Sequence, residues 1–198
     1  MLICGIDEAG RGPLAGPVVA SCVVFEHGTR RIRGVKDSKK LKADDRKELS
    51  EKIKERCLAY AIFEIDNFEI DTINILKATM RAMHRCITQL QIKPDLYLID
   101  GNYFKLEDGF EKTLNYKTII EGDDKEFAIS AASILAKVHR DEIMVKYDAV
   151  YPEYNFKQHK GYATEEHIEN VKKFGICDIH RKTFCRKYYE LIPLFVQE

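Results

Sequence analysis

The chain has 198 residues, of which 45% are hydrophobic and 32% are charged, a composition typical of a folded domain rather than of a disordered segment. Its 32 basic residues balance its 32 acidic residues, so a site for a polyanion would depend on where the charges gather. The uncharged stretch 13–25 is shorter than the roughly 20 residues of a membrane-spanning helix, and acidic residues interrupt the only apolar run near the N-terminus. The six cysteines form no CxxC pair. We therefore expect a cytoplasmic protein with reduced cysteines and no membrane association.

Short apolar runs of residues that favour strands predict strands, and apolar residues at helical spacing predict helices. The predicted strands are 2–7, 17–25, 59–65, 96–99 and 114–120. The predicted helices are 43–57, a helix capped by Asn67 that Pro94 stops, 125–150, 164–174 and 180–191. This order predicts an α/β fold, in which a mixed five-stranded sheet is flanked by helices and followed by a C-terminal helical extension.

Two acidic residues stand where predicted strands end. Asp7 closes the first strand and Asp100 closes the fourth, and sites in open α/β sheets gather at the carboxyl ends of strands. Glu8 joins the same site only if the strand bends there, since neighbours on a regular strand point to opposite faces. Converging carboxylates repel one another, and Mg²⁺ or Mn²⁺, which prefer oxygen ligands, would relieve the repulsion. Two such ions are the usual device for phosphodiester hydrolysis.

Asp141 is a further acidic candidate, because it falls in the apolar stripe of the predicted helix 125–150. That stripe should press on the sheet, and a buried carboxylate needs a cation, a metal or a proton. A metal site is one interpretation of Asp141. A salt bridge to Lys137 or Arg140 is the other.

Basic residues gather in 30–42 and again in 157–187. Each group alone is typical of a solvated surface, but two groups beside a carboxylate cluster favour a polyanionic ligand that spans them. The glycines of 10–16 do not fit a phosphate-binding loop, because a strand follows them and Pro13 removes a backbone donor. The spacing of Cys177, His180 and Cys185, with His167 nearby, fits no common zinc finger, so we treat these residues as packing or surface residues.

Six blocks follow one another along nearly the whole chain. They are DEAGRGPLAGPVVA at 7–20, DSKKL at 37–41, LIDG at 98–101, SAASILAKVHRD at 130–141, HKGYATEEH at 159–167 and HRKTF at 180–184. Together they resemble the type 2 ribonuclease H family, ribonuclease HII, and the last block is more similar to the bacterial branch. The segment 175–179 departs from the Gly-Pro-Ser-Pro-like stretch of many relatives.

The resemblance implies a ribonuclease H-like fold, with a catalytic core over 1–150 and a substrate-binding helical extension over 151–198. It implies an endonuclease that cleaves the RNA strand of RNA–DNA hybrids and nicks 5′ of single ribonucleotides in duplex DNA. The products would carry 3′-hydroxyl and 5′-phosphate ends. The implied role is the removal of ribonucleotides and RNA primers during DNA replication and repair.

The resemblance also implies roles for particular residues, by motif. The four catalytic, metal-binding carboxylates would be Asp7, Glu8, Asp100 and Asp141, holding two Mg²⁺ or Mn²⁺ ions. The substrate-binding residues would be Gly10, Arg11, Gly12, Lys39, Lys40, Lys160 and Tyr162. In this set the GRG motif would sense the ribose 2′-hydroxyl through backbone groups, and Tyr162 would pack on the next deoxyribose.

Two other functions remain open from the sequence alone. A nuclease of the same superfamily that cuts DNA would share the fold and the metals, but would give no reason for the GRG motif or Tyr162. A hybrid-binding module without catalysis would not need all four acids. We expect a monomer that acts on RNA–DNA hybrids and ribonucleotide-containing duplexes. The segment 194–198 contains no evident sliding-clamp motif.

Overall fold

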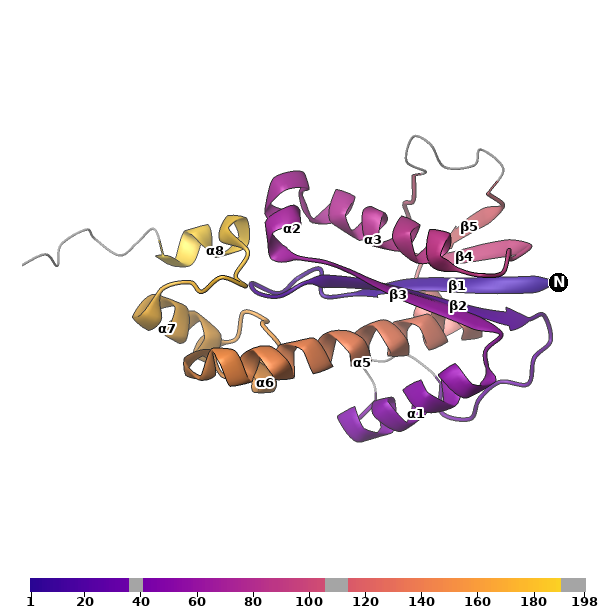
Figure 1. Ribbon diagram of the computed structural model, residues 1–198, viewed down its shortest axis with the longest axis horizontal. Coiled ribbons are helices and arrows are strands. Elements are labelled where there is room, and N and C mark those ends of the chain that lie inside the picture. Colours follow the sequence, from indigo (N-terminus) through magenta and orange to yellow (C-terminus); the bar gives the residue numbers. More distant parts are fainter. Residues whose placement is uncertain (36–40, 106–113, 190–198) are drawn as a thin grey trace, which may run out of the picture.

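The computed structural model describes residues 1–35, 41–105 and 114–189, and five strands form one mixed sheet within them (Figure 1). The strands are β1 (Leu2–Ala9), β2 (Val18–Glu26), β3 (Ala59–Ile65), β4 (Leu96–Asp100) and β5 (Tyr116–Ile119). Their order across the sheet is β3-β2-β1-β4-β5, so β1 lies at the centre. The predicted mixed five-stranded sheet is confirmed.

The pairing of β1 places its acidic end beside another strand end. β1 runs antiparallel to β2 and parallel to β4, and β4 runs parallel to β5. In the parallel pair Ile6 lies opposite Ile99, so the next residues, Asp7 and Asp100, meet at the same edge of the sheet. The sheet therefore brings together two acids that are far apart in the sequence.

Helices cover both faces of the sheet (Figure 1). On one face lie α2 (Asn67–Ile73) and α3 (Ile75–Gln89), and on the other lie α1 (Ala43–Arg56) and the long α5 (Phe127–Val150). The short α4 (Gly122–Lys125) contacts α5 and β4. Each layer has its own apolar cluster, one that includes Ile6, Val24 and Met83, and one that includes Val23, Ile53 and Leu135. All six cysteines are free thiols.

The last part of the chain packs against the end of the sheet where β1 turns into β2. It contains the 3₁₀ turn η2 (Pro152–Tyr154) and the helices α6 (Phe156–His159), α7 (Glu165–Phe174) and α8 (Lys182–Tyr189). Its buried residues, among them Tyr154 and Phe156, form one cluster with Met144 of α5 and Ala15 of the β1–β2 loop. This packing places the β1–β2 loop between the sheet and the C-terminal helices.

The helices differ from the sequence prediction at several places. The single helix expected from 67 is divided into α2 and α3 at Asn74, which has a φ of 71° and caps α3 through its side chain. Asp66, not Asn67, caps α2. Glu126, in an extended conformation, separates α4 from α5. No helix in the described ranges is both long enough and apolar enough to span a bilayer.

Candidate active site

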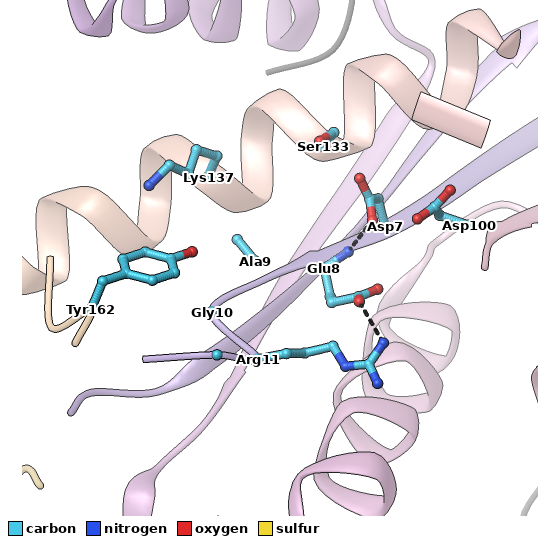
Figure 2. A pocket seen from close by; sticks show the side chains of 10 residues that line it. Asp7, Glu8, Ala9, Gly10, Arg11, Asp100, Ser133, Lys137 and Tyr162 are labelled. Atoms are coloured by element: carbon cyan, nitrogen blue, oxygen red, sulfur yellow. Dashed lines mark hydrogen bonds and ion pairs between the residues drawn. The ribbon is translucent and has the colours of Figure 1, made fainter. Parts of the chain in front are cut away.

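Asp7 and Asp100 open into one cavity at the end of the sheet (Figure 2). The cavity has a volume of about 220 Å³. Its lining comprises Asp7, Glu8, Ala9, Gly10, Arg11, Gly12, Asp100, Ser133, Lys137 and Tyr162. The structure thus brings together most of the residues predicted from separate blocks of the sequence.

Asp7 is the buried carboxylate of this cavity, and its pKa is strongly raised. Its side chain is 4% exposed. Burial raises the pKa of Asp7 well above its ordinary value, and the charges of Glu8 and Asp100 raise it further. Hydrogen bonds from Ser133 and from the Glu8 amide, at 2.7 Å for the amide, act in the opposite direction. A buried carboxylate among other carboxylates favours a bound cation or a proton.

Glu8 lies on regular strand, so the bend expected there does not occur. The β1–β2 pairing continues without interruption through Glu8 and Ala9. In Figure 2 the Glu8 side chain turns away from Asp7 toward Arg11, whose Nη1 lies 3.3 Å from Glu8 Oε1. Glu8 nevertheless lines the same cavity, because the carboxylate lies at the end of the strand where the sheet stops.

Asp123 is an acidic residue of this region that the sequence reasoning missed. It lies in α4, directly after β5, and is 8% exposed. Asp100 Oδ1 accepts a hydrogen bond from the Gly122 amide at 2.7 Å. Burial raises the pKa of Asp100, and the charge of Asp123 contributes to the rise. An acid that follows the fifth strand satisfies the same strand-end rule as Asp7 and Asp100.

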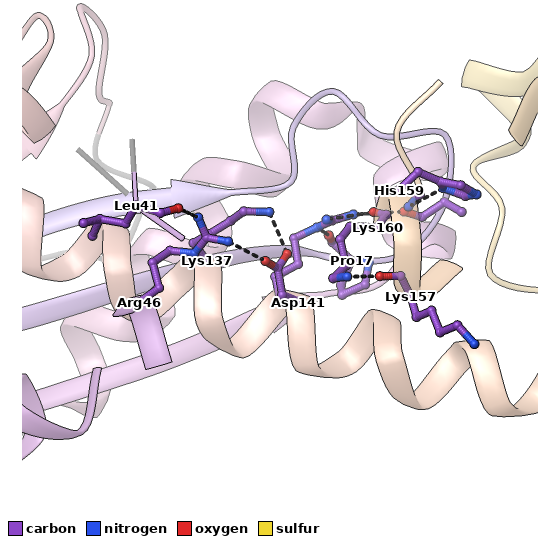
Figure 3. Close-up of polar contacts among 11 residues, drawn as sticks. Pro17, Leu41, Arg46, Lys137, Asp141, Lys157, His159 and Lys160 are labelled. Atoms are coloured by element: carbon purple, nitrogen blue, oxygen red, sulfur yellow. Dashed lines mark hydrogen bonds and ion pairs between the residues drawn. The ribbon is translucent and has the colours of Figure 1, made fainter. Parts of the chain in front are cut away.

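Asp141 does not line this cavity. Its carboxylate lies 2.6 Å from Lys137 Nζ and 3.5 Å from a guanidinium nitrogen of Arg46 on α1 (Figure 3). Ser133, which contacts Asp7, precedes Asp141 by eight helical residues, about 12 Å along the axis of α5. The structure therefore supports the salt-bridge interpretation, with Lys137 as predicted and with Arg46 in place of Arg140.

The GRG motif, residues 10–12, lines the same cavity as Ser133 and Lys137 of α5. Gly10 has a φ of 95°, and a Cβ there would lie 2.0 Å from Nε of Arg140, so only glycine fits. A Cβ at Gly12 would lie 3.9 Å from the ring of Tyr162. Tyr162 is 42% exposed, and the Lys137 Nζ lies 5.7 Å from the centre of its ring. The GRG motif and Tyr162 are therefore neighbours on one surface.

Two neutral histidines, His167 and His180, form hydrogen bonds that link the Tyr162 backbone to the C-terminal segment. His167 Nδ1 lies 2.9 Å from the carbonyl oxygen of Tyr162, so it donates, and His167 Nε2 must accept from His180 Nε2 at 3.0 Å. His180 Nδ1 accepts from the Cys177 amide at 3.0 Å. Burial lowers the pKa of His167 to about 4 and that of His180 to about 3. These residues form a packed hydrogen-bonded network, which agrees with their interpretation as packing residues.

The predicted phosphate-binding lysines fall in two categories. Lys160 lines a second hollow of about 430 Å³ beside the cavity, together with Arg46, Lys47 and Lys146. Lys39 and Lys40, with the rest of the DSKKL block except Leu41, lie outside the described residues, as does the segment 194–198. The lining of that hollow also includes Asp44, Asp141 and Glu142, so the charge around Lys160 is mixed.

The donor set of the cavity suits a hard divalent cation. Asp7, Glu8, Asp100 and nearby Asp123 offer only oxygen ligands, which Mg²⁺ and Mn²⁺ prefer. In the ligand-free arrangement of the described residues, no three acidic, histidine or cysteine side chains converge closely enough to hold an ion. The fit therefore rests on the oxygen chemistry and on the pKa of Asp7, which is raised first by burial and then by the charges of Glu8 and Asp100.

A mixed sheet with acids at the ends of adjacent parallel strands, backed by a long helix, defines a nuclease of the ribonuclease H-like class. A sequence model of the family "Ribonuclease HII" matches residues 4–188. Ribonuclease HII of Clostridioides difficile is 54% identical, over 94% of this chain and 71% of its own. Ribonuclease HII of Pelodictyon phaeoclathratiforme is 49% identical, over 92% and 89%.

Solved structures agree with this match. Ribonuclease H2 of Pyrococcus horikoshii OT3 is 29% identical with a TM-score of 0.77, covering 96% of this chain and 98% of its own. Ribonuclease HII of Archaeoglobus fulgidus, solved in complex with PCNA, is 25% identical with a TM-score of 0.72, covering 93% and 94%. Bst-RNase HIII in complex with Mn²⁺ shares the fold at 19% identity, with a TM-score of 0.63 over 87% and 61%.

The chain belongs to the ribonuclease HII family. It is an endonuclease that cleaves RNA in RNA–DNA hybrids and at ribonucleotides embedded in DNA. Bst-RNase HIII, the more distant protein with this fold, was solved in complex with Mn²⁺.

Proposed function

We propose that the cavity at the end of β1 and β4 is the hydrolytic site, and that Asp7, Glu8 and Asp100 hold two divalent cations there. The supporting observation is the buried carboxyl of Asp7, whose pKa is raised by burial and by the charges of Glu8 and Asp100. A pair of Mg²⁺ or Mn²⁺ ions would activate water and stabilise charge on the phosphate. The products would be 3′-hydroxyl and 5′-phosphate ends.

The fourth acidic residue of this site is Asp123 rather than Asp141. Asp123 is buried close to Asp100, whereas Asp141 is neutralised by Lys137 and Arg46 away from the cavity. A carboxylate already paired with two cations has little negative charge left to attract a metal. Asp123 therefore takes the role that the sequence motif assigned to Asp141.

The residues around the acids select and orient the substrate. Backbone groups of Gly10, Arg11 and Gly12 contact the ribose 2′-hydroxyl, the one constant difference between a ribonucleotide and DNA. The ring of Tyr162, beside Gly12, packs against the following sugar. Lys160, Lys39 and Lys40 bind phosphates in the same proposal, and these contacts supply affinity without reading sequence.

The biological role that follows is the removal of ribonucleotides and RNA primers from DNA. In this proposal the segment 1–150 supplies the acids, and the segment 151–198 supplies Tyr162 and Lys160. We also propose that the protein acts as a monomer.

The test is cleavage of a labelled duplex that contains one ribonucleotide, in Mg²⁺, in Mn²⁺ and in EDTA. Asp7→Asn should reduce the rate more than tenfold in either metal while leaving duplex affinity within about twofold, because it removes a ligand charge and little packing. Cleavage by the wild type in EDTA, or an Asp7→Asn rate above a tenth of wild type, would contradict the proposal.

A further inference from the structure

Two buried arginines beside the cavity have no acidic partner. Arg140 and Arg181 are both 0% exposed, and neither forms an ion pair with a described residue. Burial, together with the nearby charge of Arg140, lowers the pKa of Arg181 to about 9. Burying an unpaired guanidinium is costly, so each must be satisfied by its hydrogen bonds.

Within the described ranges, these two side chains donate only to backbone carbonyls. Arg181 donates from Nη2 to Gly10 O at 2.6 Å, from Nη1 to Arg11 O at 3.0 Å and from Nε to Gly16 O at 3.0 Å. Its own amide donates to Leu14 O at 2.8 Å. One residue of the C-terminal segment therefore forms hydrogen bonds along most of the β1–β2 loop.

The grip on Gly10 and Arg11 sets the direction of two peptide groups. All peptide bonds of the described chain are trans, so each carbonyl points away from the N–H that follows it. With the carbonyls of Gly10 and Arg11 held by Arg181, the N–H groups of Arg11 and Gly12 face the opposite side of the loop. Neither N–H donates to any described residue, and both residues line the cavity that contains Asp7.

We propose that Arg181 is a positioning residue that aims the N–H groups of Arg11 and Gly12 at the ribose 2′-hydroxyl. This inference rests on the proposed function, in which the GRG motif reads that hydroxyl. The guanidinium suits the task because its rigid fork holds three carbonyls at fixed angles. A lysine would bring the same charge as a single point and would leave the peptide groups free to rotate.

Arg140 provides a matched control. It is equally buried and also makes three hydrogen bonds to backbone carbonyls, at 3.0 to 3.1 Å, but its acceptors are Ala15, Pro17 and Lys160. Replacing Arg140, a residue of α5, with lysine removes the same kind of buried group from beside the same loop, while Arg181 keeps its hydrogen bonds to the carbonyls of Gly10 and Arg11. The two variants separate peptide orientation from general support of the loop.

The experiment compares affinities for two duplexes of one sequence, one with a single ribonucleotide and one entirely of DNA. Asp7→Asn is the parent, so that the duplexes are not cut, and Arg181→Lys and Arg140→Lys are added to it separately. The readout is the ratio of the two dissociation constants for each protein. A loss of overall stability lowers the folded fraction but leaves this ratio unchanged.

We expect the parent to prefer the ribonucleotide duplex, and Arg181→Lys to reduce this preference about fivefold or more, the worth of one lost hydrogen bond. Affinity for the DNA duplex should stay within about twofold, because phosphate contacts supply it. Arg140→Lys should keep the preference. If Arg181→Lys does not fold, Arg181→Gln, which also loses the fork, replaces it with the same expectation.

Two results would overturn the inference while leaving the proposed function intact. One is an unchanged preference in Arg181→Lys, and the other is an equal loss in Arg140→Lys. A parent without any preference would instead refute the reading of the hydroxyl by the GRG motif, and the role of Arg181 would fall with it.

Discussion

Replacing Asp141 with asparagine tests directly whether this acid is structural or a metal ligand. The carboxylate lies between Lys137 and Arg46, and the three side chains are only 17%, 19% and 12% exposed in that order. Exposed ion pairs contribute about 0–1 kcal/mol, and loss of one partner from a fully buried pair costs about 3–5 kcal/mol. For this partly buried cluster we expect Asp141→Asn to lower the free energy of unfolding by about 2 kcal/mol.

The assay is thermal unfolding in EDTA, where no divalent ion contributes. A loss of about 2 kcal/mol corresponds to a fall in Tm of roughly 4–8 °C for a chain of this length. Glu142→Gln, at the exposed neighbouring position of α5, is the control and should change stability by less than about 0.5 kcal/mol. A rise in the Tm of Asp141→Asn would refute the reasoning, because removing repulsion among metal-binding carboxylates would stabilise the metal-free protein.

Three further predictions concern the cavity and the segment that carries Tyr162. Asp123→Asn should reduce cleavage more than tenfold and Asp124→Asn, next to it, less than threefold, and equal rates would remove Asp123 from the site. Tyr162→Ala should slow cleavage of a single-ribonucleotide duplex at least tenfold while changing duplex affinity little, and a wild-type rate on that substrate would show that the ring does not recognise the junction. The unfolded chain takes up protons on His167 and His180 near their ordinary pKa of 6.5, whereas the folded chain does so only near pH 4 and pH 3. The free energy of unfolding should therefore decrease as the pH is lowered below about 7. Denaturant titrations should show a loss of about 2 kcal/mol or more between pH 7 and pH 5, and a His167→Gln/His180→Gln double variant with the same slope would contradict this assignment.

The sheet could be predicted because its strands are short apolar runs that end at glycine or at charged residues. β3 begins and ends at the predicted residues, Ala59 and Ile65. The division at Asn74 could not be predicted, because it depends on one residue leaving the helical conformation between apolar residues that continue on both sides. Periodicity identifies the face of a helix but not where its backbone breaks.

The acidic residues at the ends of strands could be predicted from the sequence. The position of an acidic residue along a helix, relative to the cavity, could not. Asp7 and Asp100 followed from the end of an apolar run. Asp141 shares a face of α5 with residues that pack on the sheet, but periodicity does not reveal that it lies two turns beyond Ser133. Asp123 was missed because the four-residue α4 has no periodicity, although an acid just after the fifth strand was a usable signal.

The grip of Arg181 on the β1–β2 loop joins residues that are 171 positions apart, from Gly10 to the beginning of the last described helix. A ribosome releases the acidic strand ends long before it releases Arg181, and contacts of such long sequence separation form late in folding. A growing or truncated chain therefore contains the acids of the cavity without the residue that orders the loop beside them.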